Sequence, residues 1–270
     1  MVSFYHRVAN HFPTSWSITQ DAFEQHVRYC LKHLKPATLD EVQTLISSGV
    51  SYEPTITFTF DDGYRENCEF AIPLLSELSV PCVYFVAVNH IINQQPFEHD
   101  LRANQPLPVN TVNELRCMAE AGIEIGLHTF NHVDFSKVTS QEEVDYEIAE
   151  SKDKLEQLIG CPVRYFAFPY GLPEQITEMA VATIRREGLQ AFCSAFGAYN
   201  MPGNDPFHIR RFHGDQNFSQ FRKWIAFDRN KVSNEPEILY PPEAAPTAAS
   251  PIIAPVPTTG SISVNQGHSV

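Results

Sequence analysis

Between Thr55 and Phe60, hydrophobic side chains alternate with threonines. A period of two with aromatic and β-branched residues predicts a β-strand. The strand runs directly into Asp61, Asp62 and Gly63. Two adjacent carboxylates cannot both be buried cheaply as anions, so they require a cation, a shared proton or water. The glycine allows a sharp turn at this point.

The same reading extends along the chain. Apolar runs predict further strands at residues 2–6, 83–88, 123–127, 163–168, 191–196 and 209–212. Apolar positions at helical spacing predict helices after Thr19, Thr38, Thr111 and Thr139 or Ser140, and over residues 66–79, 174–187 and 218–225. Residues 89–110 show neither pattern, and we expect a functional loop there that shapes the substrate groove.

Strands and helices alternate repeatedly, which indicates a parallel α/β architecture. The absence of a glycine-rich phosphate loop favours a barrel over a dinucleotide-binding fold. In barrels the catalytic and binding residues lie at the carboxyl ends of the strands, and Asp61 and Asp62 are at such an end. We expect one folded domain over residues 1–230.

The composition changes near the end of the chain. Seven prolines and no lysine or arginine fall in the last 36 residues. This composition is typical of disorder, so residues 231–270 are expected to form a Pro/Ala/Ser-rich disordered tail.

Charge and composition exclude several classes of function. The 19 basic and 32 acidic residues give a net charge of −13, which argues against nucleic acid or an anionic membrane as a partner. No apolar run reaches the length of a membrane-spanning helix. The first residues lack the pattern of a signal peptide, so a cytoplasmic location is expected unless the true start lies upstream. No feature indicates a protein partner.

A second group of candidate residues follows the strand predicted at 123–127, which runs into His128, with His132 four residues later. Two imidazoles at this spacing face the same point when the backbone turns helically. Together with an aspartate from the other strand end, they provide three ligands. Such a set leaves positions open for water and substrate, as a catalytic metal site requires.

A third group is the turn Phe168-Pro169-Tyr170-Gly171, again after a predicted strand. Proline and glycine fix an unusual turn, and a backbone N–H in such a turn can face developing negative charge. Taken alone, this motif is an ordinary turn.

The three motifs, in this order, resemble the polysaccharide deacetylase family, the NodB-homology domain of carbohydrate esterase family 4. The matches are Thr-Phe-Asp-Asp-Gly at 59–63, His-Thr-Phe-Asn-His at 128–132 and Phe-Pro-Tyr-Gly at 168–171. Residues 5–8, Tyr-His-Arg-Val, are similar to the start of one bacterial branch. The resemblance covers roughly residues 1–225, and it implies a distorted (β/α) barrel with an incomplete ring of parallel strands.

The resemblance also implies roles for individual residues. Asp62, His128 and His132 would bind one divalent metal ion, with zinc as the first expectation. Asp61 would act as the general base, and the N–H of Tyr170 would bind the oxyanion. The residue chemistry agrees, because a metal makes water easier to deprotonate and a second carboxylate can accept the proton. We further take Pro169 and Arg211 as candidates for substrate binding.

Two departures from the family pattern concern charge and proton transfer. Many members have an arginine two residues before the proline of the third motif, where this chain has Ala167. Arg211 is the candidate to supply that charge from another strand. The Leu-x-His motif that supplies the general acid has no clean match. His6, His208 and His213 are the candidates, and the proton donor stays open.

We therefore predict a metal-dependent hydrolase that removes N-acetyl groups from the sugars of a polysaccharide or its precursor. The alternatives are an O-acetyl esterase, a formamido-sugar or cyclic-amide hydrolase on the same barrel, and an inactive glycan-binding module.

Overall fold

The computed structural model describes residues 1–240 apart from residues 198, 215, 237 and 239. One contact-dense unit spans Met1–Tyr240 and so extends past the boundary expected at residue 230. Helix α11 (Arg229–Ser233) belongs to it, and the Lys231 ammonium lies over the Trp224 ring. The remainder of the expected tail, residues 241–270, lies outside the described residues.

Parallel strands form the centre of this unit. A nine-stranded sheet has the order β10-β9-β8-β7-β6-β5-β1-β11, with β4 paired to β5. Its strands are β1 (Val2–Tyr5), β4 (Lys35–Pro36), β5 (Thr55–Phe60), β6 (Cys82–Val86), β7 (Glu124–Leu127), β8 (Tyr165–Ala167), β9 (Ala191–Cys193), β10 (His208–Ile209) and β11 (Phe212–His213). A separate pair joins β2 (Arg7–Val8) to β3 (Ser17–Ile18). Every pairing between these named strands is parallel.

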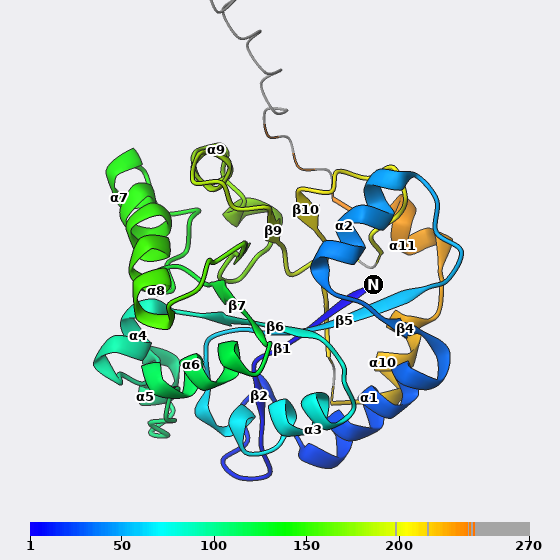
Figure 1. The fold of residues 1–270 in the computed structure, drawn as a ribbon, viewed down its shortest axis with the longest axis horizontal. Helices are drawn as coiled ribbons and strands as arrows, with labels where there is room; N and C mark the ends of the chain where they lie inside the picture. The colour runs from blue at the N-terminus through cyan, green and yellow to red at the C-terminus, as the bar shows by residue number, and fades with distance from the viewer. Residues whose placement is uncertain (198, 215, 237, 239, 241–270) are drawn as a thin grey trace, which may run out of the picture. The chain divides into compact units, whose positions relative to one another are not determined.

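Helices lie around the curved sheet (Figure 1). They are α1 (Gln20–His33), α2 (Leu39–Ser48), α3 (Ala71–Glu77), α4 (Val88–Asn93), α5 (Glu98–Arg102), α6 (Val112–Glu120), α7 (Gln141–Asp145), α8 (Ser151–Ile159), α9 (Glu178–Arg186) and α10 (Phe218–Ile225). Helices α2 and α6 begin after Thr38 and Thr111, as predicted, and both threonines form capping boxes. Ser140 caps α7. In the described part of the chain, no helix is both long enough and apolar enough to cross a lipid bilayer.

Two hydrophobic clusters explain the alternation along the strands. Ile56, Phe58 and Phe60 of β5 belong to the larger cluster, together with buried residues of the surrounding helices. Alternate residues of neighbouring strands, such as Val83 and Phe85 of β6, belong to a smaller cluster that also contains three side chains of α2. The sheet is therefore packed on both faces, as the near-continuous apolar strands require.

The ring of strands is incomplete, which confirms the predicted distorted barrel. In the described residues β10 pairs with β9 and β11 pairs with β1, so these two strands form the two edges of the sheet. The single strand predicted at 209–212 was wrong in this respect, because Arg210 and Arg211 cross the open seam between the edges. The N–H of Arg211 bonds to the carbonyl of Phe196 instead of to a neighbouring strand.

Two other predictions need correction. The segment 89–110, expected to be irregular, contains α4 and α5. Helix α4 forms because the N–H groups of Val88 and Asn89 bond to the carbonyls of Thr129 and Phe130, so the chain bends immediately after β6. The long helix expected after Ser140 is interrupted by a π-helical segment, Tyr146–Glu150, between α7 and α8.

Candidate active site

The predicted site residues meet at one edge of the sheet. Asp61 and Asp62 follow β5, His128 follows β7, and Tyr170 lies three residues beyond β8. Because these strands are parallel, their carboxyl ends face the same side. Here they line a cavity of about 520 Å³. The other residues that line it are Phe4, His6, Trp16, His99, His132, Phe168, Leu172, Ala195 and His213.

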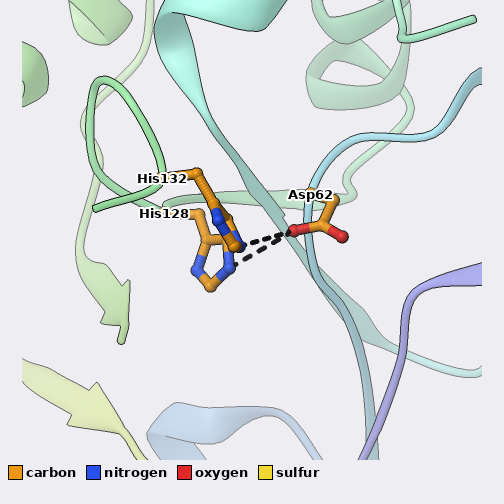
Figure 2. A group of neighbouring side chains, drawn as sticks. All are labelled: Asp62, His128 and His132. Carbon is orange, nitrogen blue, oxygen red and sulfur yellow. Dashed lines mark ion pairs between the residues drawn. The ribbon is translucent and has the colours of Figure 1, made fainter. Parts of the chain in front are cut away.

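Asp62, His128 and His132 converge on one point, as Figure 2 shows. Oδ1 of Asp62 lies 3.5 Å from Nε2 of His128 and 3.2 Å from Nε2 of His132. The three potential ligand atoms lie within 4.8 Å of one another. Burial alone would raise the pKa of Asp62, but the two imidazoles hold it well below its usual range.

This group of atoms has the chemistry of a metal site. The Asp62 Oδ1 atom is buried yet accepts no hydrogen bond of standard geometry from the described residues. A buried carboxylate oxygen that accepts no hydrogen bond is costly unless a cation compensates it. One carboxylate and two imidazoles are also ligands that Zn²⁺ takes in catalytic sites. The residues present therefore fit a divalent metal ion.

His128 is oriented for such a role by its other ring nitrogen. Its Nδ1 lies 2.8 Å from the carbonyl oxygen of Ala167. Because that oxygen only accepts, Nδ1 donates this hydrogen bond and Nε2 is the ring nitrogen that faces the site. Ala167 stands where many members of the family have an arginine, and here its backbone carbonyl orients His128.

His132 is positioned by the turn that carries it. The hydroxyl of Thr129 accepts a hydrogen bond from the His132 N–H at 2.8 Å. The buried carboxylate of Glu147 accepts from the N–H groups of Phe130 and Asn131 at 2.9 and 2.8 Å, and from the Asn131 side chain at 2.6 Å. Glu147 is a site residue that the sequence analysis missed.

Left-handed backbone geometry is concentrated at this site. Among the non-glycine residues with positive φ are Asp62 (75°), Thr129 (67°), His132 (57°) and Tyr170 (60°). This conformation costs of order 1–3 kcal/mol at each such residue, so surrounding contacts must enforce it. The strain gives independent support for a functional site at these turns.

Asp61 forms a buried ion pair with Arg211. The two guanidinium nitrogens Nη1 and Nη2 lie 2.7 and 2.8 Å from the two carboxylate oxygens. Burial would raise the pKa of Asp61, but the Arg211 charge outweighs it and the pKa is lowered. The prediction that Arg211 supplies the missing charge is confirmed. Its side chain has no exposed surface, so a role in substrate binding would have to act through Asp61 and stays a prediction.

The turn after β8 places Tyr170 at the cavity. Its ring lies 5.4 Å from that of His132, and in the described residues its N–H donates to no protein atom. Gly171 is required next to it, because a Cβ there would lie 2.7 Å from the Ala195 nitrogen. Pro169 is buried and does not line the cavity, so the structure places it in the support of the turn, and its predicted role in substrate binding stays a prediction.

The three histidine candidates for the general acid differ in whether they line the cavity. His6 and His213 line the cavity, with ring centroids 6.0 Å apart. His208 does not line it, since its Nε2 bonds to the Ser194 hydroxyl at 2.9 Å and its ring stacks on Phe192. Burial lowers the pKa of His6 to about 4.

The segment 89–110 contributes to the cavity wall through His99. Nε2 of His99 lies 2.8 Å from the hydroxyl of Tyr64, which in turn donates to Asp100 at 2.9 Å. The expectation that this segment shapes the cavity is confirmed at this residue.

Comparisons with known proteins agree with this geometry. The family model described as "Polysaccharide deacetylase" matches residues 49–192. The poly-beta-1,6-N-acetyl-D-glucosamine N-deacetylase of Staphylococcus epidermidis is 22% identical over 222 residues, which cover 80% of this chain and 75% of that protein. YxkH of Bacillus subtilis is 23% identical over 172 residues, or 63% of this chain. The match spans only about half of YxkH, 56% of its length.

Solved structures show the same fold. IcaB from Ammonifex degensii superimposes with a TM-score of 0.69 at 22% identity, over 83% of this chain and 95% of that one. Because the family model covers more than half of the chain, and a solved fold of the same type accompanies it, the assignment does not depend on any one motif. The chain belongs to the polysaccharide deacetylase family.

Proposed function

We propose that the protein is a metal-dependent hydrolase that removes N-acetyl groups from N-acetylated sugars of a polysaccharide or its precursor. The observation that carries the proposal is the convergence of Asp62, His128 and His132 beside the Arg211-paired carboxylate of Asp61. Three ligands leave room for water and substrate, and we take zinc as the metal. When bound, the metal supplies Lewis acidity, which makes water more acidic and polarises the amide carbonyl.

Asp61 acts in this proposal as the general base. Arg211 keeps the Asp61 carboxylate ionised and donates one hydrogen bond to each of its oxygens. Each oxygen retains a further lone pair, so Asp61 still accepts a proton from the attacking water. The cost of this arrangement is lower basicity, since the ion pair lowers the Asp61 pKa.

Tyr170 and His213 complete the set of roles. The N–H of Tyr170, which donates to none of the described residues, stabilises the negative charge that develops on the carbonyl oxygen. His213 is the proton donor to the leaving amine, because it lines the cavity while His208 does not. His6 is a poorer donor, since its lowered pKa keeps it neutral near pH 7.

The name of one relative supports a proposal for the substrate class. The Staphylococcus epidermidis protein bears the name of a poly-beta-1,6-N-acetyl-D-glucosamine N-deacetylase. We therefore propose a β-linked N-acetylglucosamine polymer or oligomer as the substrate.

The test is acetate release from N-acetylglucosamine oligomers by the zinc-loaded protein and its Asp61→Asn variant. We expect turnover by the wild type and a loss of at least a hundredfold in the variant with metal content unchanged. Full turnover by Asp61→Asn would show that Asp61 is not the base. Activity only on O-acetyl esters, formamido sugars or cyclic amides would assign the barrel to one of those reactions, and glycan binding without hydrolysis would indicate an inactive module.

A further inference from the structure

The stretch that begins the chain, with Tyr5, His6 and Arg7, has no role in the chemistry proposed above. Arg7 is nevertheless one of the largest fully buried side chains. Its guanidinium donates to the carbonyl oxygens of Phe12 at 2.6 Å and His11 at 2.7 Å. A buried arginine that binds two loop carbonyls fixes that loop in place.

The same arginine continues into a hydrogen-bond network. It donates to the Ser17 hydroxyl at 3.1 Å and pairs with Glu66 at 2.8 Å. The Ser17 hydroxyl lies 2.9 Å from that of Thr14, which accepts from the N–H of Trp16 at 3.3 Å. The loop between β2 and β3 is therefore anchored to the barrel on both sides of Trp16.

Trp16 is held at the cavity although much of it is open to solvent. Its ring centroid lies 4.8 Å from that of His6 and 5.8 Å, edge-on, from that of His213. The residue is 47% exposed and lines the same cavity as Asp61 and Asp62. Exposing a large aromatic surface is unfavourable in water, and an indole fixed at a cavity mouth usually contacts a ligand.

Position and chemistry together define what Trp16 contacts. His6 contacts the indole and lines the same cavity as Asp61 and Asp62, so it links Trp16 to the acidic centre. A sugar ring stacked on Trp16 therefore lies beside the ring that presents its acetyl group to the site. The apolar C–H face of a pyranose is complementary to the indole face, and its hydroxyls remain hydrated.

We propose that Trp16 forms a sugar-stacking subsite next to the reaction centre, held in place by Arg7, so that the enzyme acts on oligomers in preference to single sugars. This inference rests on the proposed function for the sugar class. Trp16 contacts the substrate directly, whereas Arg7 is a positioning residue that acts through the loop.

Fluorescence gives a test that does not depend on turnover. The chain has two tryptophans, and Trp224 lies on α10, so Trp224→Phe leaves Trp16 as the only indole. In an Asp61→Asn/Trp224→Phe background, shown to be folded by its cooperative thermal unfolding, a β-1,6-linked N-acetylglucosamine tetramer should change the emission saturably. The monomer should bind at least tenfold more weakly. No change in emission with the tetramer would overturn the subsite.

Kinetics on matched variants adds a second readout. Trp16→Ala should raise KM for the tetramer about tenfold with a much smaller change in kcat, and Trp16→Phe should restore most of the loss. Phe12→Ala is the control, because Phe12 is 63% exposed on the same loop but does not line the cavity. Arg7→Lys should raise KM with little change in kcat.

The outcomes separate this inference from the proposed function. Saturable emission changes without any acetate release would keep the subsite and refute the hydrolase. Acetate release with equal KM values for Trp16→Ala and the wild type would keep the hydrolase and refute the subsite.

Discussion

At the scale of single residues, the pair formed by Asp61 and Arg211 shows how a carboxylate stays charged inside the barrel. Neither side chain has appreciable exposed surface, and the guanidinium also bonds to the Ser194 carbonyl at 2.8 Å and the Thr59 hydroxyl at 3.1 Å. Such a pair stabilises little by itself, but breaking it leaves an uncompensated buried charge. The two residues should therefore depend strongly on each other.

The Arg211→Met variant should lose about 3–5 kcal/mol of unfolding free energy, because Asp61 is left buried without its cation. Adding Asp61→Asn should recover a large part of this loss. Urea unfolding of the two single variants and the double variant measures the coupling. Additive losses would show that the ion pair does not determine the stability at this position.

At the scale of elements, the turn that carries His132 depends on the π-helical segment Tyr146–Glu150 between α7 and α8. A π-helical turn inserts one extra residue into a helix and is frequent at functional sites. Glu147 lies within this segment and is buried, with its carboxylate directed at the turn N–H groups. The helix thereby fixes a loop that is distant in sequence.

Replacing Glu147 with Gln should weaken metal binding about 10- to 100-fold, because the amide cannot accept all three hydrogen bonds of the turn. Competition with a chelator measures the affinity. Glu150→Gln, in the same segment but on an exposed position, is the matched control. Equal affinities of the two variants would show that Glu147 does not position His132.

The motifs of the site were readable from the sequence because they follow strands whose alternation is clear. Asp62, His128 and His132 come together as the parallel topology requires. Glu147 was missed because an acid in an amphipathic helix normally lies on the solvated face. Glu147 follows Val144 by three residues, and this spacing places both side chains on the same face of a helix. Because Val144 is apolar and expected to be buried, the spacing could have indicated that Glu147 is buried too.

At the scale of the whole molecule, the described unit is a barrel left open between β10 and β11. The topology was predictable because each strand and helix has its own hydrophobic period. The position of the seam was not predictable, because the apolar residues Ile209 and Phe212 fit the pattern of a single strand. The ion pair between Arg211 and Asp61 accounts for the break in this strand, because it draws the Arg211 side chain across the seam.

A histidine at the edge of this seam, His208, should make the unfolding free energy depend on pH. On β10, burial, reinforced by Arg210, lowers the pKa of His208 to about 3. The unfolded chain therefore binds a proton at His208 more readily than the folded chain does. The neutral His208 ring contributes fully to the unfolding free energy above pH 6.5, and this contribution is lost as the pH falls toward 3. Between pH 7 and pH 5 the loss from this group is about 2 kcal/mol.

His208→Gln should remove about 2 kcal/mol of the loss of unfolding free energy between pH 7 and pH 5, while the loss that comes from His6 remains. His33→Gln, at an exposed histidine of α1, is the control and should behave as the wild type. Thermal unfolding over this pH range compares the three proteins. An unchanged pH dependence in His208→Gln would contradict the buried neutral state of His208.

The central claim is that Asp62, His128 and His132 hold a catalytic metal. Elemental mass spectrometry of the purified protein and of its His132→Ala and Asp61→Asn variants tests it most directly. We predict about one zinc ion per chain in the wild type and in Asp61→Asn, and its loss in His132→Ala. Absence of metal from the wild type after zinc is supplied, or full retention by His132→Ala, would contradict the account.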